Sequence, residues 1–151
     1  MKIAIVMGST SDTPIAEKAE AVLTEFGIEF ERHVISAHRH PVRAKKFASG
    51  LESKGFGAVI AIAGLAAHLP GVMASLTVLP VIGVPGDGGP LRGEDALLAI
   101  VQMPPGIPVA TVGIGSGKNA GLLAAQILGA GSEEMRQKMH EFRKGFGDDE
   151  A

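Results

Sequence analysis

Short apolar runs alternate along the chain with longer segments in which apolar residues recur every three or four positions. The runs are typical of strands buried on both faces, and the longer segments are typical of helices packed on a sheet. We predict strands at residues 2–7, 28–35, 58–63, 81–84 and 108–114. We predict helices at residues 14–26, 41–54, 69–76, 94–101, 118–128 and 132–144. The second of these helices is expected to turn Val42, Phe47 and Leu51 toward the core.

This alternation predicts a three-layer α/β/α fold with a mainly parallel sheet. The 151 residues are enough for a single domain, 1–151, and no internal repeat or linker interrupts them. In parallel sheets ligands bind at the carboxyl ends of the strands, where the turns into the helices begin. The turns after the first three strands are therefore the candidate site segments.

Composition excludes several function classes. The chain is 46% hydrophobic and 20% charged, as soluble globular proteins are, and its formal charge of -2 includes no long basic run that would suit nucleic acid. The absence of cysteine excludes disulfides, thiolate chemistry and cysteine zinc sites. No uninterrupted stretch of 18 apolar residues and no cleavage pattern after Met1 is present, so we expect a cytoplasmic protein without a membrane partner.

The turn after the first strand, Gly8-Ser9-Thr10-Ser11-Asp12, offers hydroxyls and backbone N–H groups at the start of a helix. Such groups can bind a phosphate, whereas Asp12 would repel one and suits the hydroxyls of a sugar. A ribose phosphate is therefore the ligand that fits the whole turn. On residue types alone, an ordinary capped turn is an equally good interpretation.

The turn after the second strand, Ser36-Ala37-His38-Arg39, places a histidine beside an arginine. Histidine titrates near neutral pH and arginine can hold an anion with two hydrogen bonds, so the pair predicts proton transfer on an anionic substrate. A structural role is the commoner explanation for an isolated loop histidine. The position of His38 at the end of a strand favours the chemical role.

The turn after the third strand contains Gly64, Ala66, Ala67, His68 and Leu69. Its small residues let a planar ligand approach the backbone closely. Taken alone, His68 could equally be a hydrogen-bonded core histidine. No carboxylate stands at a ligand-like spacing from these histidines, so we expect no metal site.

Three segments rich in glycine or proline lie outside these turns. Segment 113–119 looks like a nucleotide-binding loop, but it lacks the first glycine and the Ser or Thr of a phosphate-binding loop, so we interpret it as a capped turn. We interpret the loop 85–92 as a lid or a mouth-lining segment. The rigid segment 102–108 suits the wall of a site or a subunit contact.

Five motifs follow one another between about residue 3 and residue 144. They are Val6-Met7-Gly8-Ser9-Thr10-Ser11-Asp12, Ser36-Ala37-His38-Arg39, Ala66-Ala67-His68-Leu69-Pro70-Gly71, Val101-Gln102-Met103-Pro104 with Gly106-Ile107-Pro108-Val109, and residues 119–128. Together they resemble the N5-carboxyaminoimidazole ribonucleotide mutases of purine biosynthesis, which form class I of the aminoimidazole ribonucleotide carboxylase family. One motif alone would be weak, but five in order are highly specific.

The resemblance implies a flavodoxin-like subunit, an octamer with sites at subunit contacts, and no metal, nucleotide or biotin cofactor. We expect the C-terminal helix, about 132–144, to pack at such a contact. The implied reaction moves a carboxylate from the exocyclic nitrogen of an aminoimidazole ring to its C4 carbon, through CO2 released in a closed pocket, and His38 is the implied catalytic residue that shuttles the proton from C4. The implied substrate-binding residues are Gly8, Ser9, Ser11, Asp12, Ser36, Ala37, Arg39, Gly64, Ala66, Ala67, His68 and Leu69.

Within that set, the resemblance assigns Ser9 and Asp12 to the phosphate and ribose, Arg39 to the phosphate, and residues 64–69 to the wall that holds the ring and CO2. The main alternative is the related class that carboxylates aminoimidazole ribonucleotide directly with CO2. That class usually has lysine where Arg39 stands and lacks the Ala-Ala-His turn that contains His68. Both residues therefore favour the mutase.

The chain departs from the usual family pattern at Leu65, where glycine is common, and at His40, where threonine is common. The loops 86–92 and 113–119 also differ in length or composition. An alternative from another class is a non-enzymatic flavodoxin-like module that binds flavin or acts as a signalling receiver. The chain has no Trp or Tyr to stack on a flavin, and it lacks the acidic residues that a receiver carries at the ends of its first and third strands.

Overall fold

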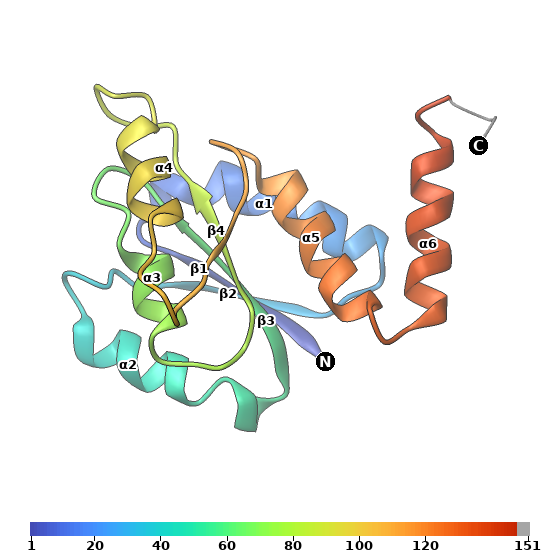
Figure 1. The fold of residues 1–151 in the computed structure, drawn as a ribbon, viewed down its shortest axis with the longest axis horizontal. Coiled ribbons are helices and arrows are strands. Elements are labelled where there is room, and N and C mark those ends of the chain that lie inside the picture. The colour runs from blue at the N-terminus through green and yellow to red at the C-terminus, as the bar shows by residue number, and fades with distance from the viewer. Residues whose placement is uncertain (148–151) are drawn as a thin grey trace.

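Five strands form one sheet in the order β2-β1-β3-β4-β5 (Figure 1). The structure is a computed structural model and describes residues 1–147. The strands are β1 (Lys2–Met7), β2 (Phe30–Val34), β3 (Phe56–Ala63), β4 (Val81–Pro85) and β5 (Ala110–Thr111). All four pairings between them are parallel, which confirms the flavodoxin-like α/β fold predicted from the sequence.

Helices cover both faces of the sheet. One layer holds α1 (Thr13–Glu25) and α5 (Gly117–Gly129), and the other holds α2 (Pro41–Ser49), α3 (Leu69–Ala74) and α4 (Glu94–Val101). Along β1, Ile3 and Ile5 enter the core under the first layer, whereas Ala4 and Val6 enter the core under the second. The two cores explain why the central strands are apolar at almost every position.

The strand order changes direction after β1. The chain passes from β1 to its neighbour on one side, β2, and later crosses to its neighbour on the other side, β3. The helices that follow β1 and β2 pack on opposite faces, so a crevice opens at the carboxyl ends of the strands. This topology predicts a ligand site at the ends of β1 and β3.

The helix predicted at 41–54 is shorter than expected, because α2 ends early and a 3-10 turn (Glu52–Lys54) follows it. The prediction that Val42 faces the core is wrong, since its side chain is 81% exposed. Ala44 and Ala48 form the buried stripe instead, and position 42 lies about 200° around the helix from position 44. Leu51 is fully buried as predicted, although it lies beyond the end of α2.

The strand predicted at 108–114 is also shorter, because only two residues of β5 pair in register with β4. The N–H of Val112 still donates to the carbonyl of Gly83 at 3.1 Å, so the chain continues beside β4 without regular strand geometry. Pro108 has no N–H to donate, which limits pairing at the start of this edge segment.

Helix α5 packs so closely on α1 that two of its positions accept only glycine. A methyl group on Gly117 would overlap the carbonyl group of Ile15, and one on Gly121 would lie 2.9 Å from the carbonyl oxygen of Ala19. Gly117 thus has a packing role, whereas the cap expected in segment 113–119 is not formed by a side chain, because Ser116 at the start of α5 makes no side-chain capping hydrogen bond.

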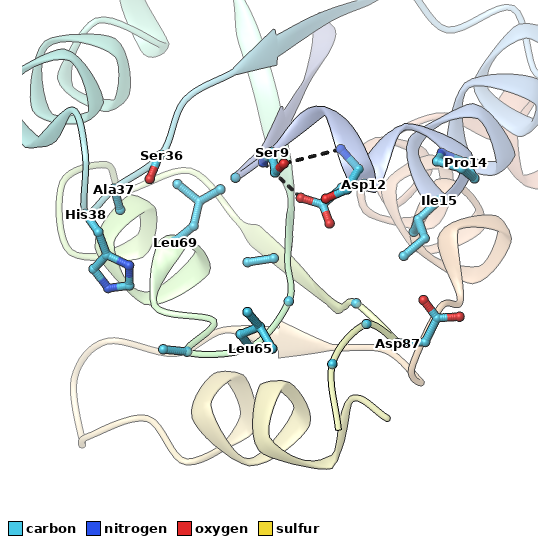
Figure 2. Close-up of a pocket in the computed structure, with 18 of the residues that line it drawn as sticks. Ser9, Asp12, Pro14, Ile15, Ser36, Ala37, His38, Leu65, Leu69 and Asp87 are labelled. Atoms are coloured by element: carbon cyan, nitrogen blue, oxygen red, sulfur yellow. Dashed lines mark hydrogen bonds between the residues drawn. The ribbon is translucent and has the colours of Figure 1, made fainter. Parts of the chain in front are cut away.

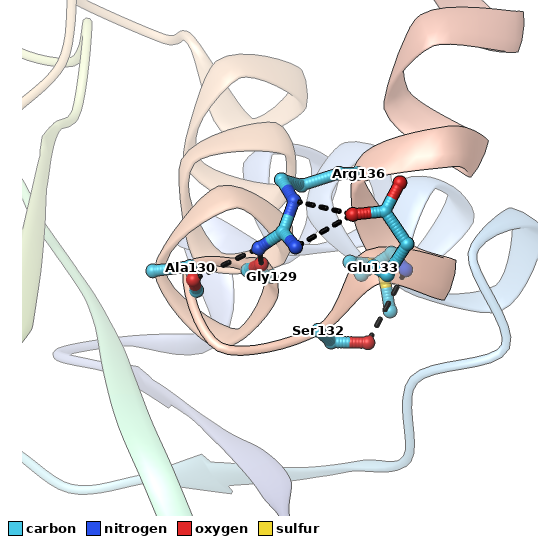
Figure 3. A network of polar contacts seen from close by, with 6 residues as sticks. Gly129, Ala130, Ser132, Glu133 and Arg136 are labelled. Carbon is cyan, nitrogen blue, oxygen red and sulfur yellow. Dashed lines mark hydrogen bonds and ion pairs between the residues drawn. The ribbon is translucent and has the colours of Figure 1, made fainter.

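The last helix, α6 (Glu133–Lys144), lies beside the end of α5 (Figure 1). Arg136 joins the two helices by donating to the carbonyls of Gly129 and Ala130 at 3.3 and 3.0 Å, and it pairs with Glu133 at 2.7 Å (Figure 3). No residue of α6 is buried, and its expected place at a subunit contact stays a prediction. None of the helices described is both long and apolar enough to cross a membrane.

Candidate functional site

A cavity of about 800 Å³ opens at the carboxyl edge of the sheet, where the topology predicts a ligand site (Figure 2). It is lined by the loops that follow β1, β2, β3 and β4 and by the first turns of α1. The structure brings together all but two of the predicted site residues at this cavity. Those lining it are Gly8, Ser9, Ser11, Asp12, Ser36, Ala37, His38, Arg39, Gly64, Ala66 and Leu69.

The two exceptions, Ala67 and His68, do not line the cavity. Ala67 is fully buried and belongs to the core beneath the turn. His68 does not line the cavity itself, but its ring contacts the ring of His38. It is exposed, so it is not the core histidine that the sequence left open.

Several lining residues were not predicted from the sequence. Ile15 and Lys18 of α1 face the cavity, as does Asp87 of the loop after β4. The helical spacing could have identified the first two, because residues three apart on a helix are neighbours, Ile15 follows Asp12 at that interval, and Lys18 follows Ile15 at the same interval. The mouth-lining role expected for the loop 85–92 is confirmed, since its first residues line the cavity.

Reciprocal hydrogen bonds fix the turn after β1. The N–H of Gly8 donates to the carbonyl of Ile62 at 3.0 Å, which joins this turn to the end of β3. The Ser9 hydroxyl accepts from the N–H of Ser11 at 3.3 Å, and the Asp12 carboxylate accepts from the N–H of Ser9 at 3.0 Å. This capping box holds the hydroxyls and the carboxylate at a helix start without a ligand.

Asp12 is the one charged residue that the structure buries among those described, with 8% of its surface exposed. Burial raises the pKa of its carboxyl group, and the hydrogen bond from the Ser9 N–H opposes that rise. A carboxylate with little water around it gains from ligand hydroxyls that donate to it. The turn therefore suits a sugar.

Arg39 reaches from the turn after β2 to the turn after β1. Its backbone N–H donates to the Ser36 hydroxyl at 3.2 Å, and its Nη2 donates to the carbonyl of Gly8 at 3.2 Å. A guanidinium group has five N–H donors, so this contact leaves donors for an anion. The exposed cation beside the Ser9 and Ser11 hydroxyls provides the positive charge that a phosphate needs.

His38 and His68 form a hydrogen-bonded pair. His38 Nε2 and His68 Nδ1 are 2.8 Å apart, and the two rings meet edge to face at 83°. At this distance one ring nitrogen donates and the other accepts, so the contact holds the His38 ring in a fixed orientation at the cavity.

The residues described include no group of three or more His, Cys, Asp or Glu arranged to hold a metal ion. The polar groups of the cavity are instead separated along its length. Figure 2 shows His38 at one end, Asp87 at the other, and Ser9 with Asp12 between them. The arrangement offers hydroxyl, amide and carboxylate contacts beside a histidine pair.

Known proteins resemble this chain over nearly its whole length. The family model described as AIR carboxylase matches residues 2–148. The N5-carboxyaminoimidazole ribonucleotide mutase of Pyrococcus abyssi is 52% identical over 143 residues, which are 95% of this chain and 82% of that protein. The protein of the same name from Methanocaldococcus jannaschii is 56% identical over 142 residues, 94% of this chain and 88% of that protein. The crystal structure of Treponema denticola PurE matches with a TM-score of 0.84 at 30% identity and covers 97% of this chain and 95% of that chain.

Proposed function

The chain belongs to the AIR carboxylase family, and from this membership and the geometry of the site we propose that it is a mutase of purine biosynthesis. As an isomerase, it converts N5-carboxyaminoimidazole ribonucleotide to 4-carboxyaminoimidazole ribonucleotide. The observation that carries this proposal is the pair formed by His38 and His68. His38 lines the same cavity as the turn after β1, which suits a ribose phosphate.

The ribonucleotide is held at its sugar and phosphate. We assign the phosphate to the hydroxyls of Ser9 and Ser11 and to the guanidinium group of Arg39, and the ribose hydroxyls to Asp12. Support comes from the capping box that fixes these groups in place and from the low exposure of Asp12. Contacts remote from the reacting bond can position the ring and contribute to rate through binding.

The chemistry balances around one proton. Loss of CO2 from the carbamate leaves the exocyclic nitrogen one proton short, and attack of C4 on CO2 leaves C4 with one proton too many. A group that gives a proton to nitrogen and then takes one from C4 returns to its starting state. We assign this role to His38, whose ring is oriented by the contact with His68.

CO2 must stay beside the ring between the two steps. The turn formed by residues 64–69 supplies the small and apolar wall for this purpose, with Ala66 and Leu69 on the cavity surface. Exclusion of water keeps CO2 from escaping or hydrating. We also propose a homo-octamer whose subunit contacts complete the site, since the monomer leaves several large apolar side chains exposed.

Direct carboxylation of aminoimidazole ribonucleotide by CO2 is the alternative reaction. The residues that distinguish the two classes are Arg39 and His68, and both match the mutase pattern. His68 also contacts His38, so its presence bears on the site itself. Relatives at 52% and 56% identity carry the mutase name, which further favours this reaction.

Substitution of the histidines tests the assignment. We expect His38→Asn to fold and bind the ribonucleotide but to lose turnover by roughly 10²- to 10⁴-fold, the usual contribution of general acid–base catalysis. His68→Asn should cause a smaller loss and move the pH profile, because it changes the partner of His38. His33→Asn, outside the cavity, is the matched control and should leave turnover unchanged. Turnover by His38→Asn near the wild-type rate would refute the assignment.

A further inference from the structure

Leu65 is unusual in both its side chain and its backbone. It is 53% exposed although it is apolar, and its φ is +53°, a left-handed value that glycine adopts readily and leucine rarely. Such a conformation persists where the surrounding structure enforces it, and outliers of this kind gather at functional sites.

The side chain lies against the loop 86–93, at Gly89. A methyl group built on Gly89 would overlap the Leu65 Cδ2 atom, and the φ of Gly89 is +84°, so this position requires glycine on two grounds. Both residues line the cavity, Leu65 from the turn after β3 and Gly89 from the loop after β4. The contact thus joins two walls of the site, and Figure 2 shows the Leu65 side chain from which it is made.

The backbone of the loop is joined to the end of β3 at its start, whereas, in the part of the chain that the structure describes, its tip is joined only to the turn that follows within the same loop. The N–H of Gly86 donates to the carbonyl of Ala63 at 2.8 Å, and a methyl group on Gly86 would lie only 3.1 Å from the Cα atom of Gly64. Within residues 1–147, the N–H groups of residues 87–89 donate no backbone hydrogen bond. The carbonyl of Gly89 accepts from the N–H of Arg92 at 3.3 Å, a bond within the loop that does not join its tip to the turn after β3, whereas the packing of Leu65 does.

We propose that Leu65 is a positioning residue that holds the tip of the loop 86–93 against the cavity, so that CO2 stays beside the ring carbon during the transfer. This rests on the mutase function proposed above. A loop tip that moves away opens the cavity to water and lets CO2 leave before C4 captures it. Glycine at position 65 would relieve the backbone strain but would lose the contact.

Loop motion can be measured without activity, because the chain has no Trp or Tyr. One tryptophan introduced as Leu91→Trp reports on the loop by fluorescence anisotropy. In that background, Leu65→Ala should lower the anisotropy and Leu65→Met should restore it, since methionine refills the space. With the reporter placed as Phe142→Trp on α6, the same changes should have no effect. Unchanged anisotropy at position 91 in Leu65→Ala would overturn the proposal.

Retention of CO2 gives the second measurement, with carboxyl-labelled N5-carboxyaminoimidazole ribonucleotide as the substrate. We expect Leu65→Ala and Leu65→Gly to release label to solution roughly 3- to 10-fold more often than wild type, with kcat lowered and KM little changed. Leu65→Gly loses the contact but has no backbone strain at φ +53°, so a similar result for Leu65→Ala and Leu65→Gly would assign the effect to the contact. Equal release by wild type and both variants would overturn the proposal. Wild-type protein that does not turn over would instead overturn the mutase function, while the anisotropy result would stand.

Discussion

Asp12 shows how a single binding residue can oppose folding. Burial raises the pKa of its carboxyl group in the folded state above the unfolded value, so the ionised form is less favourable in the folded protein. The cost is present when the pH exceeds the folded-state pKa and disappears as the pH falls below the unfolded-state value. The ionised carboxylate can nevertheless bind a ligand well, because ligand hydroxyls can donate hydrogen bonds to it.

Asp12→Asn keeps an oxygen that can accept from the Ser9 N–H but removes the charge. We expect a higher free energy of unfolding at pH 7 than in wild type, with the gain shrinking as the pH falls, measured by denaturant titration at several pH values. Ribonucleotide affinity should fall by roughly 10-fold, the effect of losing a charged hydrogen-bond acceptor. In wild type, protonation of Asp12 at acid pH should weaken ribonucleotide binding, and this contribution should be absent in Asp12→Asn.

Two results would contradict this account of Asp12. If Asp12→Asn bound the ribonucleotide with unchanged affinity in a calorimetric titration, the proposed contact between Asp12 and the ribose would be refuted. A stability gain that grows toward acid pH would contradict the burial argument, because its sign would be reversed. Ser9→Ala provides a comparison that lowers affinity without removing the charge.

At the scale of elements, local signals made the site turns predictable. Each turn follows the end of an apolar run, and its Gly, Ser and His residues identify it without knowledge of the fold. The contact between His38 and His68 could not be predicted, because it depends on β2 and β3 lying on either side of β1. The error at Val42 has a similar cause, since packing decides which face of a short helix is buried.

The close contact between α1 and α5 predicts how a substitution at Gly121 changes stability. Alanine normally favours a helix over glycine by about 1 kcal/mol, yet Gly121→Ala should lower the free energy of unfolding by about 1–3 kcal/mol. The reason is that the new methyl group would lie 2.9 Å from the carbonyl oxygen of Ala19. Gly131→Ala, where nothing lies within 4 Å, is the matched control and should be neutral or stabilising. Equal free energies of unfolding for the two variants in chemical denaturation would contradict the close packing of α5 on α1.

At the scale of the whole molecule, several large apolar side chains lie on the surface. Val42, Val78 and Leu98 are 81%, 85% and 59% exposed. Single exposed residues are common, but Leu98 and Val101 are both exposed and lie three apart on α4, on one face of that helix. These residues are candidates for the subunit contacts of an octamer.

Light scattering tests the assembly. We expect a mass of about eight times the 15.5 kDa chain, as the octamer proposed above requires. Leu98→Glu should lower that mass and reduce turnover, because a charge would replace an apolar contact, whereas Leu98→Met should keep both. A wild-type monomer at micromolar concentration would contradict both the octamer and the shared site.

The fate of the carboxylate in N5-carboxyaminoimidazole ribonucleotide tests the central claim most directly. The purified protein is given this substrate with a labelled carboxyl group, at low bicarbonate and without ATP, and the label is followed into 4-carboxyaminoimidazole ribonucleotide. We predict rapid conversion with the label largely retained, because the cavity confines the CO2 that it releases. Conversion only from aminoimidazole ribonucleotide at high CO2, with the labelled carbamate unused, would contradict the account and establish direct carboxylation instead.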